Sequence, residues 1–209
     1  MKRNTGKLVV ICGSMFSGKS EELMFRLRRA GYAKKKVLTI KHQIDTRKSF
    51  ACIVSHNGEK REANSIGNCS DGMHALIEMV DDTIDVIGID EIQFFPPAVI
   101  PIFQQFVNEG KQVIVAGLDM NFRGEPFGIV PTLMAIADEV IKLRAICISC
   151  GNEANLSQRL INGVPARYDD PTILVGGEES YEARCRHCFT CEGAQSDQAA
   201  QRTTESLCV

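Results

Sequence analysis

The feature that most constrains this chain is a glycine-rich turn between an apolar run and an amphipathic segment. The turn matches the pattern G-x-x-x-x-G-K-[ST] over residues 13–20. It follows the apolar run 8–12 and precedes residues 20–30, where apolar residues recur among charges. A strand, a tight turn and a helix in this order predict a phosphate-binding loop. Its residues are Gly13, Ser14, Met15, Phe16, Ser17, Gly18, Lys19 and Ser20.

Each part of this loop suits the binding of ATP. Gly13 and Gly18 allow the backbone to turn tightly, so that its N–H groups point at the phosphates. The helix that begins here adds the positive end of its dipole. Lys19 would place a positive charge on the β- and γ-phosphates, and Ser20 is expected to bind Mg²⁺. A chance match in an ordinary strand–turn–helix is the alternative.

Two acidic residues close another apolar run, residues 86–90. Asp90 ends the run and Glu91 follows it directly. An acidic pair at a strand end, downstream of a phosphate-binding loop, is typical of a Walker-B element. Asp90 is expected to hold the Mg²⁺ shell, and Glu91 is expected to act as a general base. The base would act on water in a hydrolase and on a substrate hydroxyl in a kinase. A solvated strand end with helix-capping acids is the structural alternative.

The remaining apolar runs predict an α/β fold. Short apolar runs with helical stretches between some of them indicate βαβ units and a mainly parallel sheet, that is, a P-loop NTPase-like core. Residues 42–72 have weak periodicity and are expected to be strand and loop. The predicted strands are 8–12, 37–41, 86–90, 112–117 and 139–143, and the predicted helices are 20–30 and 98–109.

Two C-x₂-C pairs predict a structural Zn²⁺ site. Tetrahedral Zn²⁺ takes four thiolates, and each pair supplies two of them. His187 and Cys191 lie close enough in sequence to replace the last ligand, but Cys188 preserves the paired spacing. The unit 145–191 is therefore expected to be a small zinc-ribbon-like domain, after a kinase core at 1–144 and before a disordered tail at 192–209. The predicted ligands are Cys147, Cys150, Cys185 and Cys188.

Composition limits the partners of this chain. The formal net charge of its 209 residues is −2, which gives no overall basic field for a nucleic acid backbone. No apolar run reaches the about 20 residues that a membrane-spanning helix needs. Nine cysteines without a recognisable secretion signal favour reduced thiols and a cytoplasmic protein. We therefore expect neither a nucleic acid nor a membrane as partner.

Five sequence blocks narrow the class of protein further. The strings at 15–20, 89–95 and 117–127 resemble the cellular (type II) thymidine kinase family. So do Asp-Thr-Arg at 45–47 and Val-Gly-Gly at 175–177, with a tyrosine at 181 before the last cysteine pair. The resemblance runs from about Gly6 to Cys191. It implies a kinase that transfers the γ-phosphate of ATP to the 5′-hydroxyl of thymidine or deoxyuridine, giving dTMP.

The resemblance also implies roles for individual residues. Glu91 would be the base on the 5′-hydroxyl, and Arg47 would reach the transferring phosphate with Asp45 beside it. Three phenylalanines would wall the thymine, and Met15 and Leu118 would pack near its methyl group. A lasso loop from Thr172 to Tyr181 would close over the base, with the zinc site pinning both its ends. The wall residues are Phe94, Phe122 and Phe127, and the lasso residues are Thr172, Ile173, Leu174, Val175, Gly176 and Tyr181.

The same resemblance implies a homotetramer and feedback inhibition by dTTP. Two other functions fit the first three motifs. One is a P-loop ATPase of nucleic-acid metabolism whose zinc ribbon grips DNA or RNA, and the other is a non-catalytic nucleotide-binding module. The ATPase would need a basic surface, but the basic residues of 145–191 are scattered among acids. Intact Lys19, Asp90 and Glu91 argue against a non-catalytic module.

Overall fold

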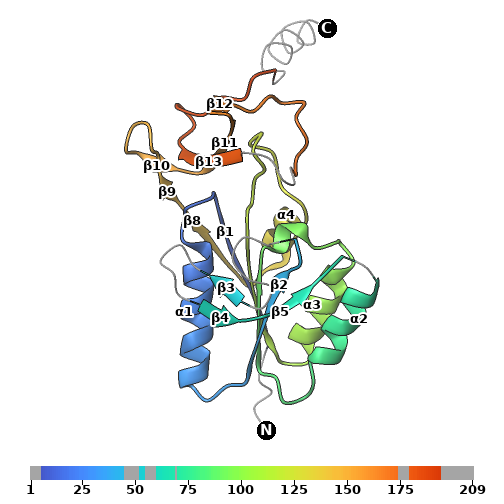
Figure 1. Cartoon of the computed structure of the whole chain (residues 1–209). Coiled ribbons are helices and arrows are strands. Elements are labelled where there is room, and N and C mark those ends of the chain that lie inside the picture. The colour runs from blue at the N-terminus through green and yellow to red at the C-terminus, as the bar shows by residue number, and fades with distance from the viewer. Residues whose placement is uncertain (1–5, 45–51, 55–59, 69, 174–178, 194–209) are drawn as a thin grey trace, which may run out of the picture.

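The core of the molecule is a six-stranded parallel sheet with helices on both faces (Figure 1). The computed structural model describes residues 6–44, 52–54, 60–68, 70–173 and 179–193. The strand order is β5-β2-β6-β7-β1-β8. The core elements are β1 (Lys7–Gly13), α1 (Lys19–Tyr32), β2 (Val37–His42), β5 (Asn64–Ile66), α2 (Ser70–Met79), β6 (Val86–Asp90), η1 (Ile92–Phe94), α3 (Val99–Asn108), β7 (Gln112–Gly117), α4 (Val130–Ile136) and β8 (Glu139–Leu143).

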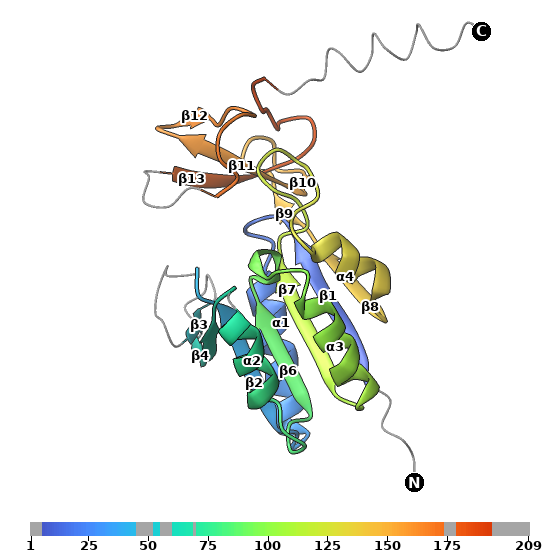
Figure 2. The ribbon, with the colours of Figure 1, turned by 90° about the vertical axis from the view of Figure 1, so that its right-hand side faces the viewer.

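Apolar residues on both faces of the strands explain this arrangement. On β1, Val9 and Ile11 pack toward α1, while Leu8 and Val10 belong to the cluster shared with α2, α3 and α4. Figure 2 shows α1 on one side of the sheet and these three helices on the other. All five predicted strands are present and parallel, and both predicted helices are confirmed as α1 and α3. The predicted α/β P-loop NTPase-like fold is therefore confirmed.

The segment 42–72 contains more regular structure than its sequence pattern indicates. β3 (Cys52–Val54) and β4 (Lys60–Glu62) form an antiparallel pair, and β5 adds the sixth strand beside β2. Each of these strands is three residues long. Three residues are too few to show an alternating apolar pattern, so β5 follows from its pairing with β2 rather than from its own sequence.

A second group of strands lies beyond the carboxyl ends of the core strands (Figures 1 and 2). β11 pairs with β12 and β13, and β9 pairs with β10, all of them antiparallel. The elements are β9 (Ala145–Ile146), β10 (Glu153–Ala154), β11 (Leu156–Ile161), β12 (Val164–Pro165) and β13 (Glu179–Arg184). This group carries the four cysteines, and it sits over the end of the sheet where the phosphate loop begins. Among the described residues, no helix combines the length and the apolar character that crossing a bilayer requires.

One glycine of β6 allows α1 to approach the sheet closely. A Cβ added at Gly88 would lie 2.4 Å from Cδ1 of Leu27, which is fully buried. We expect Gly88→Ala to lower the free energy of unfolding by about 1–3 kcal/mol, the usual cost of overpacking a core. Urea denaturation measures this change in the free energy of unfolding. Gly31→Ala is the control, because a Cβ at that position meets no atom within 4 Å. An unchanged midpoint for Gly88→Ala would contradict the close packing.

Candidate active site and metal centre

The phosphate loop occupies the turn between β1 and α1, as predicted. Gly13 has φ of 145°, and a Cβ there would lie 2.3 Å from the carbonyl oxygen of Leu143. Only glycine fits a backbone that turns this closely against β8. Ser17 Oγ donates a 2.8 Å hydrogen bond to the carbonyl oxygen of Ser14, which steadies the turn. Phe16, at φ of 64°, is 47% exposed. Gly18 precedes the first residue of α1.

Lys19 and Ser20 begin α1 and point back toward the loop and β6. Lys19 Nζ donates a 2.7 Å hydrogen bond to the carbonyl oxygen of Ser14. Ser20 Oγ donates a 2.8 Å hydrogen bond to Oδ2 of Asp90. β7 separates β1 from β6 in the sheet, so this bond links the phosphate loop to the acidic pair across an intervening strand. The two residues that the sequence predicts as Mg²⁺ ligands are therefore in direct contact.

Asp90 is a buried carboxyl group whose surroundings disfavour its charge. It is 6% exposed, and burial, followed by the charge of Glu91, raises its pKa to about 7. The hydrogen bond from Ser20 and the charge of Lys19 act in the opposite direction. The Asp90 carboxylate and the Ser20 hydroxyl offer oxygen ligands, and a bound divalent cation would stabilise the charged form of Asp90. The donor set therefore fits Mg²⁺.

Glu91 lies at the carboxyl end of β6 in an unusual backbone conformation. Its φ and ψ are 55° and 41°, a left-handed conformation that costs free energy for any residue other than glycine. This turn takes the chain from β6 into η1, and the side chain of Gln93 donates a hydrogen bond to Oε2 of Glu91. The side-chain oxygen of Gln93 in turn accepts a 3.0 Å hydrogen bond from the backbone N–H of Leu118. A buried glutamine thus connects Glu91 to the end of β7.

Two of the predicted nucleoside contacts, Phe94 and Phe127, lie against each other. The rings of Phe94 and Phe127 meet edge to face, with centroids 5.8 Å apart, and both are partly exposed. Phe95 is buried in the core, so Phe94 is the one of the two that faces the site. Met15 and Leu118 are also partly exposed, and the backbone N–H of Met15 donates a 2.9 Å hydrogen bond to Ser157 of β11. Phe122 differs, because it is only 4% exposed.

The other predicted nucleoside contacts fall into two groups. Thr172, Ile173 and Tyr181 are described: Ile173 is 45% exposed, and Tyr181 pairs with Arg159 across β13 and β11. The rest lie outside the described residues, namely Asp45, Leu174, Val175 and Gly176, and so does Arg47, the residue predicted to reach the transferring phosphate.

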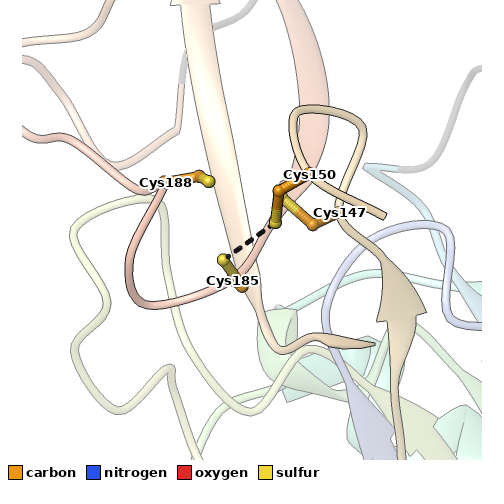
Figure 3. Close-up of side chains that lie close together, drawn as sticks. All are labelled: Cys147, Cys150, Cys185 and Cys188. Carbon is orange, nitrogen blue, oxygen red and sulfur yellow. Dashed lines mark hydrogen bonds between the residues drawn. The ribbon is translucent and has the colours of Figure 1, made fainter. Parts of the chain in front are cut away.

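The four predicted zinc ligands converge at the base of the small unit (Figure 3). Two come from the loop after β9 and two from the residues after β13, and their Sγ atoms all lie within 4.8 Å of one another. The Sγ atoms of Cys150 and Cys185 are 3.6 Å apart. Tetrahedral Zn²⁺ with bonds of about 2.3 Å needs sulfurs about 3.8 Å apart, so the cluster fits that ion. Cys191 lies elsewhere, with Sγ 3.9 Å from the carbonyl oxygen of Ala166.

Backbone N–H groups favour the thiolate form of two of the four cysteines, Cys147 and Cys185. A hydrogen bond from the backbone of Cys188 is the main reason that the pKa of Cys185 is lowered. Burial opposes ionisation of Cys147, but backbone hydrogen bonds, of which that of Cys185 is the largest, lower its pKa to about 6. Thiolates are the form that binds metal, so two of the four residues are prepared for it.

Sequence reasoning missed several residues that shape the site. Gln93 lies within one of the family-like strings but received no role. Ser157 and Arg159 of β11, and Arg123 after β7, also received none. A serine or glutamine in a strand or turn carries no sequence signal of its own, because its partner comes from a distant element. Arg159 lies in a strand whose other residues are largely buried, and a charged residue at such a position indicates a specific role.

Comparison with known proteins agrees with these observations. A family model described as "Thymidine kinase" matches residues 6–189. A thymidine kinase of Coprothermobacter proteolyticus is 56% identical over 180 residues, which covers 86% of this chain and 88% of that protein. Among solved structures, the genome packaging NTPase B204 of Sulfolobus turreted icosahedral virus 2, in complex with ATP-gammaS, has a TM-score of 0.45 at 16% identity, over 66% of this chain and 75% of that chain. The replication initiator DnaA, bound to AMPPCP and single-stranded DNA, has a TM-score of 0.39 at 14% identity, over 66% of this chain and 40% of that chain. These two TM-scores are too low to support an argument, but the family match and the close relative are decisive: this chain belongs to the thymidine kinase family.

Proposed function

We propose that this chain is a thymidine kinase that transfers the γ-phosphate of ATP to the 5′-hydroxyl of thymidine. Family membership supports the reaction, and the observation that carries the site is the contact of Ser20 with Asp90, next to Glu91. This contact joins the phosphate loop, the metal-binding position and the proposed base in one place. The product, dTMP, would supply DNA synthesis by salvage in the cytoplasm.

The phosphate end of the site is built from the loop and the start of α1. The backbone of residues 13–18 would hold the triphosphate, and Lys19 would move from the carbonyl oxygen of Ser14 to the phosphates. Ser20 and Asp90 would hold Mg²⁺, which neutralises charge on the phosphates when it is bound. The cation would also keep Asp90 ionised despite its burial. Arg47 is our candidate for a further positive charge on the transferring phosphate.

The acceptor end of the site is built around Glu91. Gln93 turns its amide N–H₂ toward Glu91 because its oxygen is committed to the backbone N–H of Leu118. The carboxyl group of Glu91 accepts this hydrogen bond, which fixes its orientation for the role of general base. Glu91 would take the proton of the 5′-hydroxyl as the phosphate transfers. Its strained backbone then aims the carboxylate at one position.

The thymine would lie between aromatic rings. Phe94 and Phe127 offer partly exposed rings, and Met15 and Leu118 would pack near the methyl group of the base. A flat apolar slot suits a pyrimidine base, whose polar edge the lasso loop with Tyr181 would read, while Asp45 would lie beside Arg47. The four clustered cysteines would bind structural Zn²⁺, leaving no open coordination position for chemistry. A homotetramer and inhibition by dTTP remain expectations from the family.

A coupled assay separates the competing functions. Purified protein is given ATP and Mg²⁺, and ADP release is followed with thymidine, with deoxyuridine, with single-stranded DNA, or with no acceptor. We expect release that depends on the nucleoside and yields dTMP. Release stimulated by DNA would favour the ATPase instead, and a protein that binds ATP without any release would be a non-catalytic module. The ratio of thymidine to deoxyuridine turnover shows how far the methyl group is recognised.

Gln93 gives a test of how Glu91 is positioned. We expect Gln93→Met, which keeps the side-chain shape, to lower kcat by about 10- to 100-fold, because Glu91 loses its fixed orientation. The KM for ATP should stay within about two-fold, since the phosphate loop does not contact this residue. Gln105→Met is the matched control: Gln105 also donates a hydrogen bond to a glutamate, but on the exposed face of α3. Equal kcat values for the two variants would exclude a positioning role for Gln93.

A further inference from the structure

An arginine in the loop after β7 fastens a short segment of the small unit, residues 168–172. The guanidinium of Arg123 donates three hydrogen bonds to this segment. Its acceptors are the carbonyl oxygen of Tyr168 at 2.5 Å, the carbonyl oxygen of Asp170 at 2.6 Å and the hydroxyl of Thr172 at 2.8 Å. Three hydrogen bonds from one planar group fix a segment in orientation as well as in place. The core and the small unit are therefore joined at this point by one side chain.

A second arginine reaches the same segment from β11. Arg159 is fully buried, and its Nη1 donates a 2.7 Å hydrogen bond to the carbonyl oxygen of Pro171. Its Nε and Nη2 have no hydrogen-bond partner among the residues that the structure describes. A buried cation with unmade hydrogen bonds is costly for stability. A residue of this kind is expected where its position serves function rather than stability.

The two arginines also converge on one aromatic ring. The guanidinium carbon of Arg159 lies 3.8 Å from the ring centroid of Phe122, and that of Arg123 lies 4.7 Å from it. Both distances are within the range of cation–π attraction. Phe122 is nearly buried by these contacts, whereas Phe94 and Phe127 stay partly exposed. The same pair of cations therefore holds Phe122 and the segment 168–172 in a fixed relation.

We propose that Arg123 and Arg159 are positioning residues for the nucleoside, acting through the segment 168–172 and through Phe122. The segment ends at Thr172, where the proposed lasso begins, and Phe122 is one of the three rings predicted to wall the base. The inference thus rests on the proposed function, because the lasso and the slot are assigned to thymidine there. The two arginines would raise the affinity for the nucleoside without changing the affinity for ATP. The zinc cluster would hold the far end of the lasso, after β13.

The test compares two substitutions in the full-length, zinc-loaded protein. We expect Arg123→Met, which removes all three hydrogen bonds, to raise the KM for thymidine at least about ten-fold, because the loss of a single charge-assisted hydrogen bond can already cost that much. The KM for ATP and the zinc content should stay within about two-fold, because neither site contacts this arginine. Arg167→Met is the control, since Arg167 directly precedes the segment 168–172 and its exposed side chain pairs with Asp169 at the surface. It should change neither KM.

A double-mutant cycle connects Arg123 to the segment directly. Thr172→Val removes one acceptor of Arg123 and should raise the KM for thymidine in the wild-type background. It should have little further effect in the Arg123→Met background, because the interaction is already lost. Hydrogen exchange of residues 166–173 should become faster in Arg123→Met, and Arg159→Met should behave in the same way.

Two results would overturn the inference. In the first, Arg123→Met lowers the melting temperature but the folded enzyme keeps its KM for thymidine. In the second, the KM values for ATP and thymidine rise together. Failure of the proposed function would look different, because the wild-type protein would then release no ADP in response to thymidine.

Discussion

Glu91→Gln is expected to lower kcat by about 10³-fold, within the range that general-base catalysis contributes. Glutamine has nearly the same shape but cannot accept the proton of the 5′-hydroxyl. The phosphate loop does not depend on this carboxylate, since Lys19 and Ser20 bond to Ser14 and Asp90 instead. The affinity for ATP, measured by calorimetry, should therefore stay within about three-fold of wild type. Steady-state assays with saturating thymidine and ATP give kcat.

Glu109→Gln is the control for this experiment. Glu109 is an exposed glutamate after α3 that also accepts a hydrogen bond from a glutamine. The substitution makes the same chemical change far from β6, and its kcat should equal that of wild type. If Glu91→Gln retained wild-type kcat, Glu91 would not be the base.

Loss of the metal should raise the KM for thymidine much more than the KM for ATP. We expect Cys188→Ser to bind little Zn²⁺ and to raise the KM for thymidine more than about ten-fold, because a structural zinc site supplies much of the order of a small unit. The cluster ties the loop after β9 to the residues after β13. These residues follow the C-terminal end of the proposed lasso. The KM for ATP should change by less than about three-fold, since the phosphate loop is built on β1 and α1. Zinc content is read by atomic emission and both KM values by the coupled assay.

Cys191→Ser is the matched control, because Cys191 is only three residues from Cys188. Its thiol lies against Ala166 and not in the cluster, so zinc content and both KM values should match wild type. The pair of variants also decides which cysteine is the fourth ligand. An unchanged thymidine KM in zinc-free protein would contradict the support that we assign to the metal. Loss of zinc in Cys191→Ser would contradict the ligand set.

The parallel sheet was predictable because its central strands carry strong local signals. Strands β1, β6 and β7 are continuous apolar runs, and buried parallel strands need apolar side chains on both faces. Helix α4 and strand β5 were missed because each is short, with seven and three residues, and the ten-residue helix α2 was missed as well. The order of the strands was not predictable either. It depends on crossovers that place β7 between β1 and β6, and no residue pattern records that choice.

The residues of the candidate site also fall into those that the sequence predicts and those that only the folded structure reveals. Asp90, Lys19 and the clustered cysteines belong to motifs whose spacing reflects chemistry, so the sequence alone identifies them. Gln93 is fixed by Leu118, 25 positions away, and Arg159 bonds to Pro171, 12 positions away; such partners become neighbours only in the folded chain. Their roles follow from the hydrogen bonds and not from the residue type.

A crystal structure with thymidine and a non-hydrolysable ATP analogue bound tests the role of Glu91 directly. We expect an oxygen of Glu91 about 2.6–3.2 Å from the 5′-oxygen, the distance that proton transfer requires. We also expect the base between Phe94 and Phe127 and the triphosphate on residues 13–20. A structure in which Glu91 points into solvent, or in which another side chain contacts the 5′-oxygen, would contradict this role.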